Sequence, residues 1–239
     1  MRKLTVSLIL ALSALSSNAN ADALGLYIGG GVWDHDPVGT FGTTGDDVID
    51  MESNLKYSGE KDSYVYVAFE HFVPLVPNVR IESASMGHTG TSSADVIFNG
   101  QTVNTGSASV TNLDTTDAIL YWRVLDNWVN FDIGLNARKL DADFTVGDET
   151  VEVSETIPML YVNAQFDLPL TGLSVGADIN VISYGDASYQ DIRVRALYEM
   201  GVIGIELGLK TTNLELKGLD NVNADLEFKG MMVGAFLHF

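Results

Sequence analysis

Apolar and polar residues alternate with a period of two through almost the whole chain after residue 22. The segment 173–181 shows the pattern, since its apolar residues Leu173, Val175, Ala177, Ile179 and Val181 alternate with Ser174, Gly176, Asp178 and Asn180. Successive side chains of a β-strand point to opposite faces, so this period predicts strands with one apolar and one polar face. Helical periodicity is hard to find in the same region. The sequence therefore predicts an all-β fold.

Ten segments carry the alternation, at about 24–33, 63–72, 79–88, 116–124, 129–140, 157–167, 173–184, 189–199, 202–212 and 226–239. The connections at 73–78, 125–128, 168–172 and 200–201 are short, those at 34–62, 89–115, 141–156 and 213–225 are long, and 185–188 is a short exception. Strands of about ten residues with short turns at one end and long loops at the other are typical of an outer-membrane barrel. We therefore expect a transmembrane, antiparallel, up-and-down β-barrel of ten strands, with both termini in the periplasm. Merging or losing one hairpin would give eight strands.

A soluble β-sandwich or lipocalin-like barrel would also alternate, so the chemistry of each face matters. The polar row carries many charged residues: Glu70, Arg80, Glu82, Asp117, Arg123, Asp132, Arg138, Asp178, Asp191, Arg193, Arg195, Glu206 and Lys210. Burying them in a soluble core would be prohibitive, whereas a membrane barrel is polar inside. A soluble fold could instead turn the same row to water, so the charges alone leave both folds open.

Aromatic residues provide a second test. Several lie on the apolar row within a few residues of a predicted short turn or of the C-terminus: Phe69, Trp122, Phe131, Phe166, Tyr198 and Phe239. Membrane barrels carry such a girdle where lipid meets water, and a soluble sandwich has no reason for one. The girdle favours the membrane barrel.

The first residues have the order of a secretory signal peptide. Arg2 and Lys3 precede an apolar run over 4–15, and Ala19-Asn20-Ala21 supplies a small-residue cleavage site. The run is too short to cross a bilayer as a helix. We expect residues 1–21 to be removed and residues 22–239 to form a single barrel domain. The chain has no Cys, so its stability in an oxidising compartment cannot come from disulfides.

The composition is strongly acidic, with 32 Asp and Glu against 13 Lys and Arg and a formal net charge of −19. This charge argues against a nucleic-acid partner, which needs a basic face. Much of the acid lies in the predicted loops 34–62 and 141–156, which could hold divalent cations such as Ca²⁺ or Mg²⁺. No complete calcium loop is present, however, and Asp34-His35-Asp36 and Asp141-Ala142-Asp143 are weak signals. The sequence predicts no specific metal site and no cofactor, and solvated loops are the preferred interpretation.

The C-terminal strand has its own signature: Met231, Val233, Ala235, Leu237 and Phe239 form an alternating apolar row that ends the chain. This row resembles the C-terminal signal by which bacterial outer-membrane proteins are recognised by the barrel assembly machinery. More specifically, EHFVPLVPNVR at 70–80, DAILYWRVLDNWVNFDIGL at 117–135 and the closing His238-Phe239 resemble an uncharacterised family of proteobacterial outer-membrane β-barrels. The resemblance implies a barrel that contacts outer-membrane lipid and lipopolysaccharide. It implies no activity.

Three functions fit this reading. The basic and acidic residues of the polar row could pair across a narrow lumen and plug it, which predicts a structural or surface-interaction protein. Alternatively, Arg193 and Arg195, two residues apart on one wall, could line a narrow channel for small solutes. A third hypothesis is a hydrolase at the barrel rim that pairs His88 with Asp114 or Asp117. No nucleophile motif supports it, so we expect no enzyme.

Overall fold

The computed structural model describes residues 24–239 except residues 74, 185 and 186. The predicted signal peptide lies outside the described residues. Within them there is no helix long and apolar enough to cross a membrane. The strands are β1 (Leu24–Thr43), β2 (Ile49–Asp50), β3 (Glu60–His71), β4 (Asn78–Thr91), β5 (Val96–Phe98), β6 (Gln101–Val103), β7 (Ala108–Asp126), β8 (Val129–Val146), β9 (Glu149–Leu168), β10 (Leu173–Tyr184), β11 (Ala187–Met200), β12 (Ile203–Leu219) and β13 (Val222–His238).

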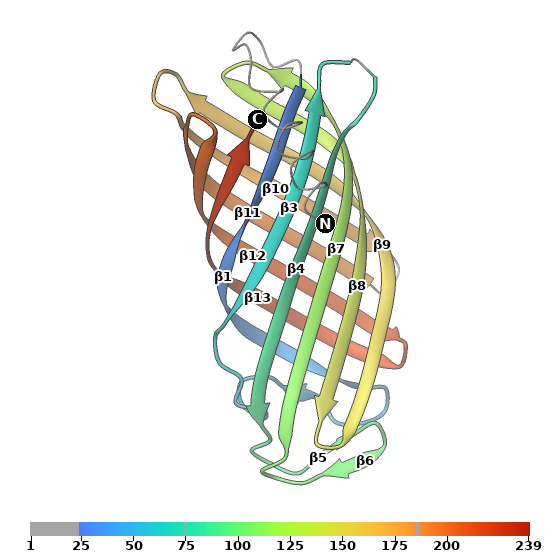
Figure 1. Cartoon of the computed structure of the whole chain (residues 1–239). Coiled ribbons are helices and arrows are strands. Elements are labelled where there is room, and N and C mark those ends of the chain that lie inside the picture. Colours follow the sequence, from blue (N-terminus) through green and yellow to red (C-terminus); the bar gives the residue numbers. More distant parts are fainter. Residues whose placement is uncertain (1–23, 74, 185–186) are drawn as a thin grey trace, which may run out of the picture.

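The long strands form a closed barrel (Figure 1). Each pairs antiparallel with its neighbours in the order β13-β12-β11-β10-β9-β8-β7-β4-β3-β1, and β13 pairs again with β1 from Tyr27↔His238 to Thr43↔Val222. The two-residue β2 pairs with β1, and β5 and β6 form a separate hairpin. The chain is thus an all-β, antiparallel, closed barrel of ten strands, which confirms the predicted fold class. The alternative of eight strands is wrong.

The two ends of the barrel differ. At the end where the described chain starts and finishes, Leu26 and Phe239 exchange two backbone hydrogen bonds of 3.0 Å. The short turns 127–128, 169–172 and 201–202 and the connection between β3 and β4 lie at this end, which we call the terminus end. The opposite end, called the far end, carries the longer connections 44–59 and 92–107. The β5–β6 hairpin belongs to it and lies at the bottom of Figure 1.

Two of the predicted long loops are wrong, because the strands continue through them. The segment 141–156 belongs to β8 and β9, which are joined at residues 147–148, and 213–225 belongs to β12 and β13. At the latter turn Asp220 and Asn221 have φ values of 47° and 67°, the left-handed values that a two-residue hairpin turn requires. The loops at 34–62 and 89–115 are real but shorter, since β1 reaches Thr43 and β4 reaches Thr91.

The prediction of loops at these segments failed because the apolar face and the polar face of each strand change sides partway along the strand. On β8 the inward row changes from Asp132, Gly134, Asn136 and Arg138 to Leu140, Ala142, Phe144 and Val146, and the outward row changes from Ile133, Leu135 and Ala137 to Lys139, Asp141 and Asp143. On β13 the outward residues Asp225, Glu227 and Lys229 give way to Met231, Val233, Ala235 and Leu237 near the terminus end. The period of two never stops, but the apolar face moves from outside to inside, and this change resembles the end of a strand.

The barrel therefore has two differently built parts. Around the half next to the terminus end runs a belt of exposed apolar side chains, here called the apolar band, as a lipid-facing surface requires. Towards the far end the interior is apolar and the exterior polar, as in a water-soluble barrel. Its buried interior residues, here called the far-end core, include Phe41, Phe98, Phe144, Phe228, Leu113 and Leu226.

A matched pair of substitutions on one face of β8 tests this division. Leu135 is 63% exposed and lies in the apolar band. Asp143 also points outward, but it lies towards the far end, where the outer face of β8 is polar. In a bilayer, Leu135→Arg should lower the free energy of unfolding by about 2–4 kcal/mol, because a cation on the lipid face is costly at the midplane. Asp143→Arg should change it by about 0.5 kcal/mol or less. Urea titration in lipid vesicles measures both, and equal effects would contradict the division.

Candidate functional site: the lumen

The charged residues of the polar row lie in the barrel interior. Those that are buried are Glu82, Asp117, Asp132, Arg138, Asp178, Asp191, Arg193, Arg195, Glu206 and Lys210, and those that are partly buried are Glu70, Arg80 and Arg123. They fill the middle of the lumen and the part next to the terminus end, which we call the charged zone. Strand alternation accounts for this, because each of these residues is at a position whose side chain points into the barrel.

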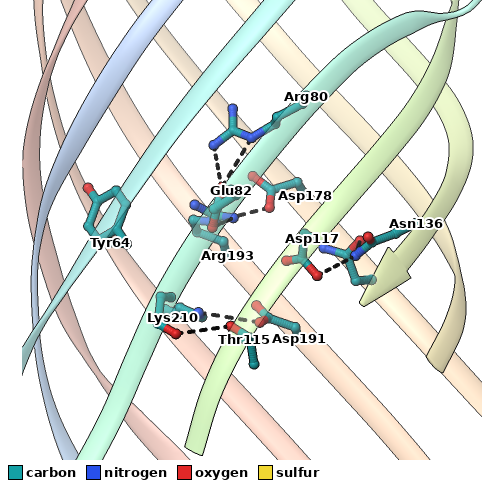
Figure 2. A network of polar contacts seen from close by, with 12 residues as sticks. Tyr64, Arg80, Glu82, Thr115, Asp117, Asn136, Asp178, Asp191, Arg193 and Lys210 are labelled. Atoms are coloured by element: carbon teal, nitrogen blue, oxygen red, sulfur yellow. Dashed lines mark hydrogen bonds and ion pairs between the residues drawn. The ribbon is translucent and has the colours of Figure 1, made fainter. Parts of the chain in front are cut away.

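One group of ion pairs crosses the lumen from β4 to β11 (Figure 2). Glu82 accepts from Arg80 at 2.6 Å through one carboxylate oxygen and from Arg193 at 2.9 Å through the other. The Arg193 Nε–H also reaches Asp178 at 3.1 Å. Because β4 and β11 are not neighbours in the sheet, these contacts span the interior.

The same group continues along β11 and β12. Arg195 bridges Asp178 at 2.8 Å and Glu206 at 3.3 Å, and the Tyr64 hydroxyl donates to Glu206 at 2.6 Å. Tyr64 belongs to β3, so this contact again crosses the lumen. Each buried carboxylate in the group thereby has a cationic or hydroxyl partner, which is what retains a charge inside a protein.

A second group centres on Arg138 of β8. Its guanidinium donates to Asp117 through Nε at 2.7 Å and Nη2 at 2.6 Å, and through Nη1 to Asp191 at 3.1 Å. Lys210 also reaches Asp191, at 3.3 Å. The Asn136 side-chain amide donates to Asp117 at 3.0 Å. Two parallel bonds to one carboxylate are the strongest geometry a guanidinium offers.

A third group lies nearer the terminus end. Arg123 reaches Glu70 at 2.7 Å and Asp132 at 3.1 Å. The Tyr121 hydroxyl donates to Glu70 at 2.7 Å, and Asn163 donates to Asp132 at 2.9 Å. Glu70 is on β3, and its partners come from β7, so the group again ties different strands together.

These groups leave little free space in the middle of the barrel. The cavity among Trp33, Glu82, Arg193 and Lys210 has a volume of about 10 Å³, which is the minimum needed for a single water molecule. Beyond it, towards the far end, the buried aromatic and aliphatic side chains of the far-end core continue the filling. Among the described residues, two successive layers of side chains, one charged and one apolar, thus occupy the lumen.

Sequence analysis missed the neutral members of these groups. The tyrosines Tyr64 and Tyr121 and the amides of Asn136 and Asn163 complete the hydrogen bonding of the carboxylates. The sequence contained the information needed to find them, because each of these residues lies on the same inward face of its strand as the charged residues around it. Considering every residue of the inward row, and not only the charged ones, would have identified them.

The residues of the aromatic girdle lie towards the terminus end. Phe69, Trp122, Phe166 and Tyr198 are exposed on the outer surface, and Phe131 and Phe239 are partly buried. Of the C-terminal row, Met231, Val233, Ala235 and Leu237 point outward, whereas Met232 and Phe236 between them are buried. This placement gives the outer wall a continuous apolar surface where the last strand closes the barrel.

The pairing of His88 with Asp114 or Asp117 is wrong. Asp114 points outward, and Asp117 is bound by Arg138. His88 instead lies inside the barrel, where its Nδ1–H donates to the Ser58 carbonyl at 3.1 Å and its Nε2 lies 3.2 Å from His35 Nδ1. The other ring nitrogen of His35 lies 3.2 Å from Asp62. This row of side chains ends at a backbone carbonyl, so it contains no nucleophile next to a base.

The two histidines lie beyond the apolar band and make stability depend on pH. Burial, the neighbouring His88 and, more weakly, Lys210 lower the pKa of His35 from 6.5 to about 4, although Asp62 opposes the shift, and burial also lowers the pKa of His88. An unfolded chain binds protons at these rings below its ordinary pKa, while the folded chain resists them. The contribution of this pair to the free energy of unfolding is therefore complete above about pH 6.5 and is lost as the pH falls towards 4.

We expect the urea midpoint to fall between pH 6.5 and 4, and His35→Gln with His88→Gln to flatten that fall. His71→Gln, at the terminus end and outside this pair, controls for the replacement of a histidine as such. A slope that is the same in all these proteins would show that carboxylates, not this pair, determine the pH dependence.

The acidic motifs do not converge. Asp34 and Asp36 point outward from β1 on either side of the inward His35, and Asp141 and Asp143 lie on the outer face of β8. Lys139 approaches Asp141 at 2.7 Å, and Ser154 donates to it at 2.6 Å. Among the described residues, no group of three or more His, Asp or Glu side chains is placed to hold a metal ion.

Comparison with known proteins supports the fold. No protein-family model matches the sequence, and no curated protein does. The outer membrane protease OmpT from Escherichia coli is similar in structure, with a TM-score of 0.52, 10% identity, and coverage of 94% of this chain and 100% of that chain. Ail of Yersinia pestis (TM-score 0.41, 14% identity, 90% of this chain, 99% of that one) and the translocator domain of the autotransporter NalP from Neisseria meningitidis (0.37, 12%, 100%, 96%) are more distant. At these identities the likeness to OmpT shows a shared outer-membrane barrel fold and nothing about chemistry.

Proposed function

We propose that this chain is an integral outer-membrane protein with a closed lumen and a structural or surface-interaction role. The observation that carries the proposal is the filling of the interior by two layers in series. The cavity among Trp33, Glu82, Arg193 and Lys210 in the charged zone has a volume of only about 10 Å³, and the far-end core lies beyond it. A solute would have to break several buried ion pairs and then cross packed aromatic side chains. Among the described residues, the filled interior argues against the narrow solute channel, and the row of His88, His35 and Asp62, which has no nucleophile beside it, argues against the rim hydrolase.

The orientation is part of the proposal. The apolar band and the girdle near the terminus end fit a barrel whose short turns and termini face the periplasm, after export by the signal peptide and insertion by the assembly machinery. The polar far end would then project beyond the lipid, beside lipopolysaccharide, where its outward carboxylates could meet divalent cations. An epitope inserted at the Asp220–Asn221 turn should be accessible to antibody on intact cells. Accessibility only after the outer membrane is broken would reverse the orientation.

Planar-bilayer recording tests the closed lumen. The purified protein should give no discrete unitary conductance steps. Arg193→Ala with Arg195→Ala should also remain silent, because the far-end core still closes the barrel behind the loosened ion pairs. Steps in the unaltered protein, with an ion selectivity that changes in this double variant, would instead support the narrow channel lined by these two arginines.

A further inference from the structure

The interior widens at the terminus end into a cavity of about 490 Å³, here called the vestibule. Residues of the short turns, including Asn127, Gly172 and Gly201, form its mouth, and Arg80 and Arg195 of the charged zone lie at its inner end. Sites for small molecules usually have volumes of about 300–1,000 Å³, so the vestibule is large enough for a ligand. Because the side chains of the charged zone fill the lumen further in, a ligand would enter from the terminus end.

Two carboxylates in the wall of the vestibule have no cationic partner among the described residues. Asp126 lines the cavity and is exposed, and its carboxylate has neither a hydrogen bond nor an ion pair there. Asp167 accepts only from neutral side chains, namely the amides of Asn130 at 2.6 Å and Gln165 at 2.9 Å and the hydroxyl of Ser174 at 2.6 Å. Asp126 is the cross-strand neighbour of Asn130, so the two acids lie on the same part of the wall.

The guanidinium groups of the vestibule do not offset these two charges. Each is already held by carboxylates: Arg80 by Glu82, Arg123 by Glu70 and Asp132, and Arg195 by Asp178 and Glu206. An anion would have to displace one of these carboxylates, whereas a cation meets the uncompensated charges of Asp126 and Asp167. Packed side chains and lipid around the vestibule have a low dielectric constant, which focuses this negative potential into the cavity.

Two tyrosine hydroxyls supply an independent sign of a ligand. Tyr66 and Tyr161 are only 4% and 6% exposed and line the vestibule, yet neither hydroxyl has a hydrogen-bond partner in the part of the chain that the structure describes. The unpaired hydroxyl of Tyr189 is fully enclosed by protein, whereas these two are not, so they are reached from the cavity. Phenolic oxygens accept hydrogen bonds from ammonium groups, and the rings offer apolar faces to an aliphatic chain.

A single metal ion does not match this arrangement. No three His, Asp or Glu side chains of the described residues converge closely enough to hold one. The acceptors of the vestibule are instead spread out, with the two carboxylates next to the turns and the two hydroxyls further along their strands. Such a set is matched by a flexible ligand whose own positive charges are separated by apolar segments.

We propose that the vestibule binds a linear polyamine, an aliphatic chain that carries two or more ammonium groups. One terminal ammonium group would contact Asp126 and Asp167 near the mouth. The methylene chain would pack on the tyrosine rings, and an inner ammonium group would donate to the hydroxyls of Tyr66 and Tyr161. This binding requires only that the terminus end is open to water, so it does not depend on the orientation of the barrel or on whether the lumen conducts.

Isothermal titration calorimetry on the protein in phosphatidylcholine nanodiscs tests the proposal, with empty nanodiscs as the blank, because this lipid has no net charge. Spermidine is the probe, and butylamine, triethylene glycol and glucose 6-phosphate are the singly charged, neutral and anionic comparisons. We expect saturable binding of spermidine at one site, binding of butylamine that is weaker by about tenfold, and no binding of the other two. Absence of spermidine binding, or equally strong binding of the neutral or anionic compound, overturns the proposal.

A matched pair of double variants locates the site. Asp126→Asn with Asp167→Asn removes the same charge as Asp141→Asn with Asp143→Asn, but the second pair lies on the outer face of β8. The first should weaken spermidine binding by about tenfold, because two partly exposed charge pairs are lost, and the second should leave it within about twofold.

Asp126→Asn alone provides a second test if the double variant does not fold, because the Asp126 carboxylate makes no contact within the described barrel. This variant should weaken spermidine binding by about threefold. Equal effects of the two double variants would place the bound spermidine on the acidic outer surface, and that result, or an unchanged affinity in Asp126→Asn, would refute the assignment to the vestibule.

Discussion

Replacing Arg138 by methionine is expected to lower the free energy of unfolding by about 3–5 kcal/mol, because it leaves buried carboxylates without their partner. Asp117 would lose both of its guanidinium bonds and keep only the Asn136 amide. Asp191 would still have Lys210 at 3.3 Å. Urea titration in vesicles, followed by the shift of the folded band on unboiled SDS gels, measures the loss.

Two further variants separate the buried charge from the lost packing. Arg138→Met combined with Asp117→Leu removes the unpaired carboxylate and should recover at least half of the lost stability. Lys229→Met breaks the exposed pair between Lys229 and Glu227 and should cost about 0–1 kcal/mol. If Arg138→Met costs no more than Lys229→Met, the charged zone does not stabilise the barrel through its pairing.

Replacing Phe144 by alanine is expected to cost about 3–5 kcal/mol, as for a large aromatic side chain in a close-packed protein core. Phe144 is fully buried at the far end, and its ring packs against Phe41 with centroids 4.8 Å apart. The segment lay in a predicted loop, where the same substitution would have almost no effect. The urea midpoint therefore distinguishes a packed far-end core from a loop.

Phe166→Ala is the matched control for Phe144→Ala. Phe166 is 47% exposed on the outer wall, where lipid can occupy the space that the ring leaves. Its loss should cost less than half as much as that of Phe144. Protease cleavage should also increase at the far end of Phe144→Ala but not of Phe166→Ala, because local unfolding begins where packing has been lost. A larger cost for Phe166 than for Phe144 would contradict the assignment of an apolar interior to the far end.

The period of two was sufficient to predict the strands, because strand alternation is a local property of the backbone. Each of the ten predicted segments lies within one barrel strand or extends a single residue beyond it, and whether a residue such as Arg138 or Glu206 faces inward follows from counting along the chain. The strand ends could not be found in the same way. At Arg138 and Leu140 the inward row changes from charged to apolar without any change of period. Only knowledge of which face meets lipid, and where, distinguishes such a change from the end of a strand.

The sequence by itself thus indicated the all-β barrel, favoured ten strands over eight, and determined the side of the wall on which the residues of the alternating rows lie. The tertiary structure alone decided which interior residues meet. Arg193 contacts Glu82, which is 111 positions away in the sequence. His88 contacts His35, although Asp114 and Asp117 are closer to it in the sequence. The physical reason is that the direction in which a side chain points is a local property of its strand. Contacts across the lumen, in contrast, depend on the closure of the barrel and on the stagger of all its strands. The same closure decided that Asp141, Asp143 and Glu152 lie on the outer face of a packed hairpin instead of in a solvated loop.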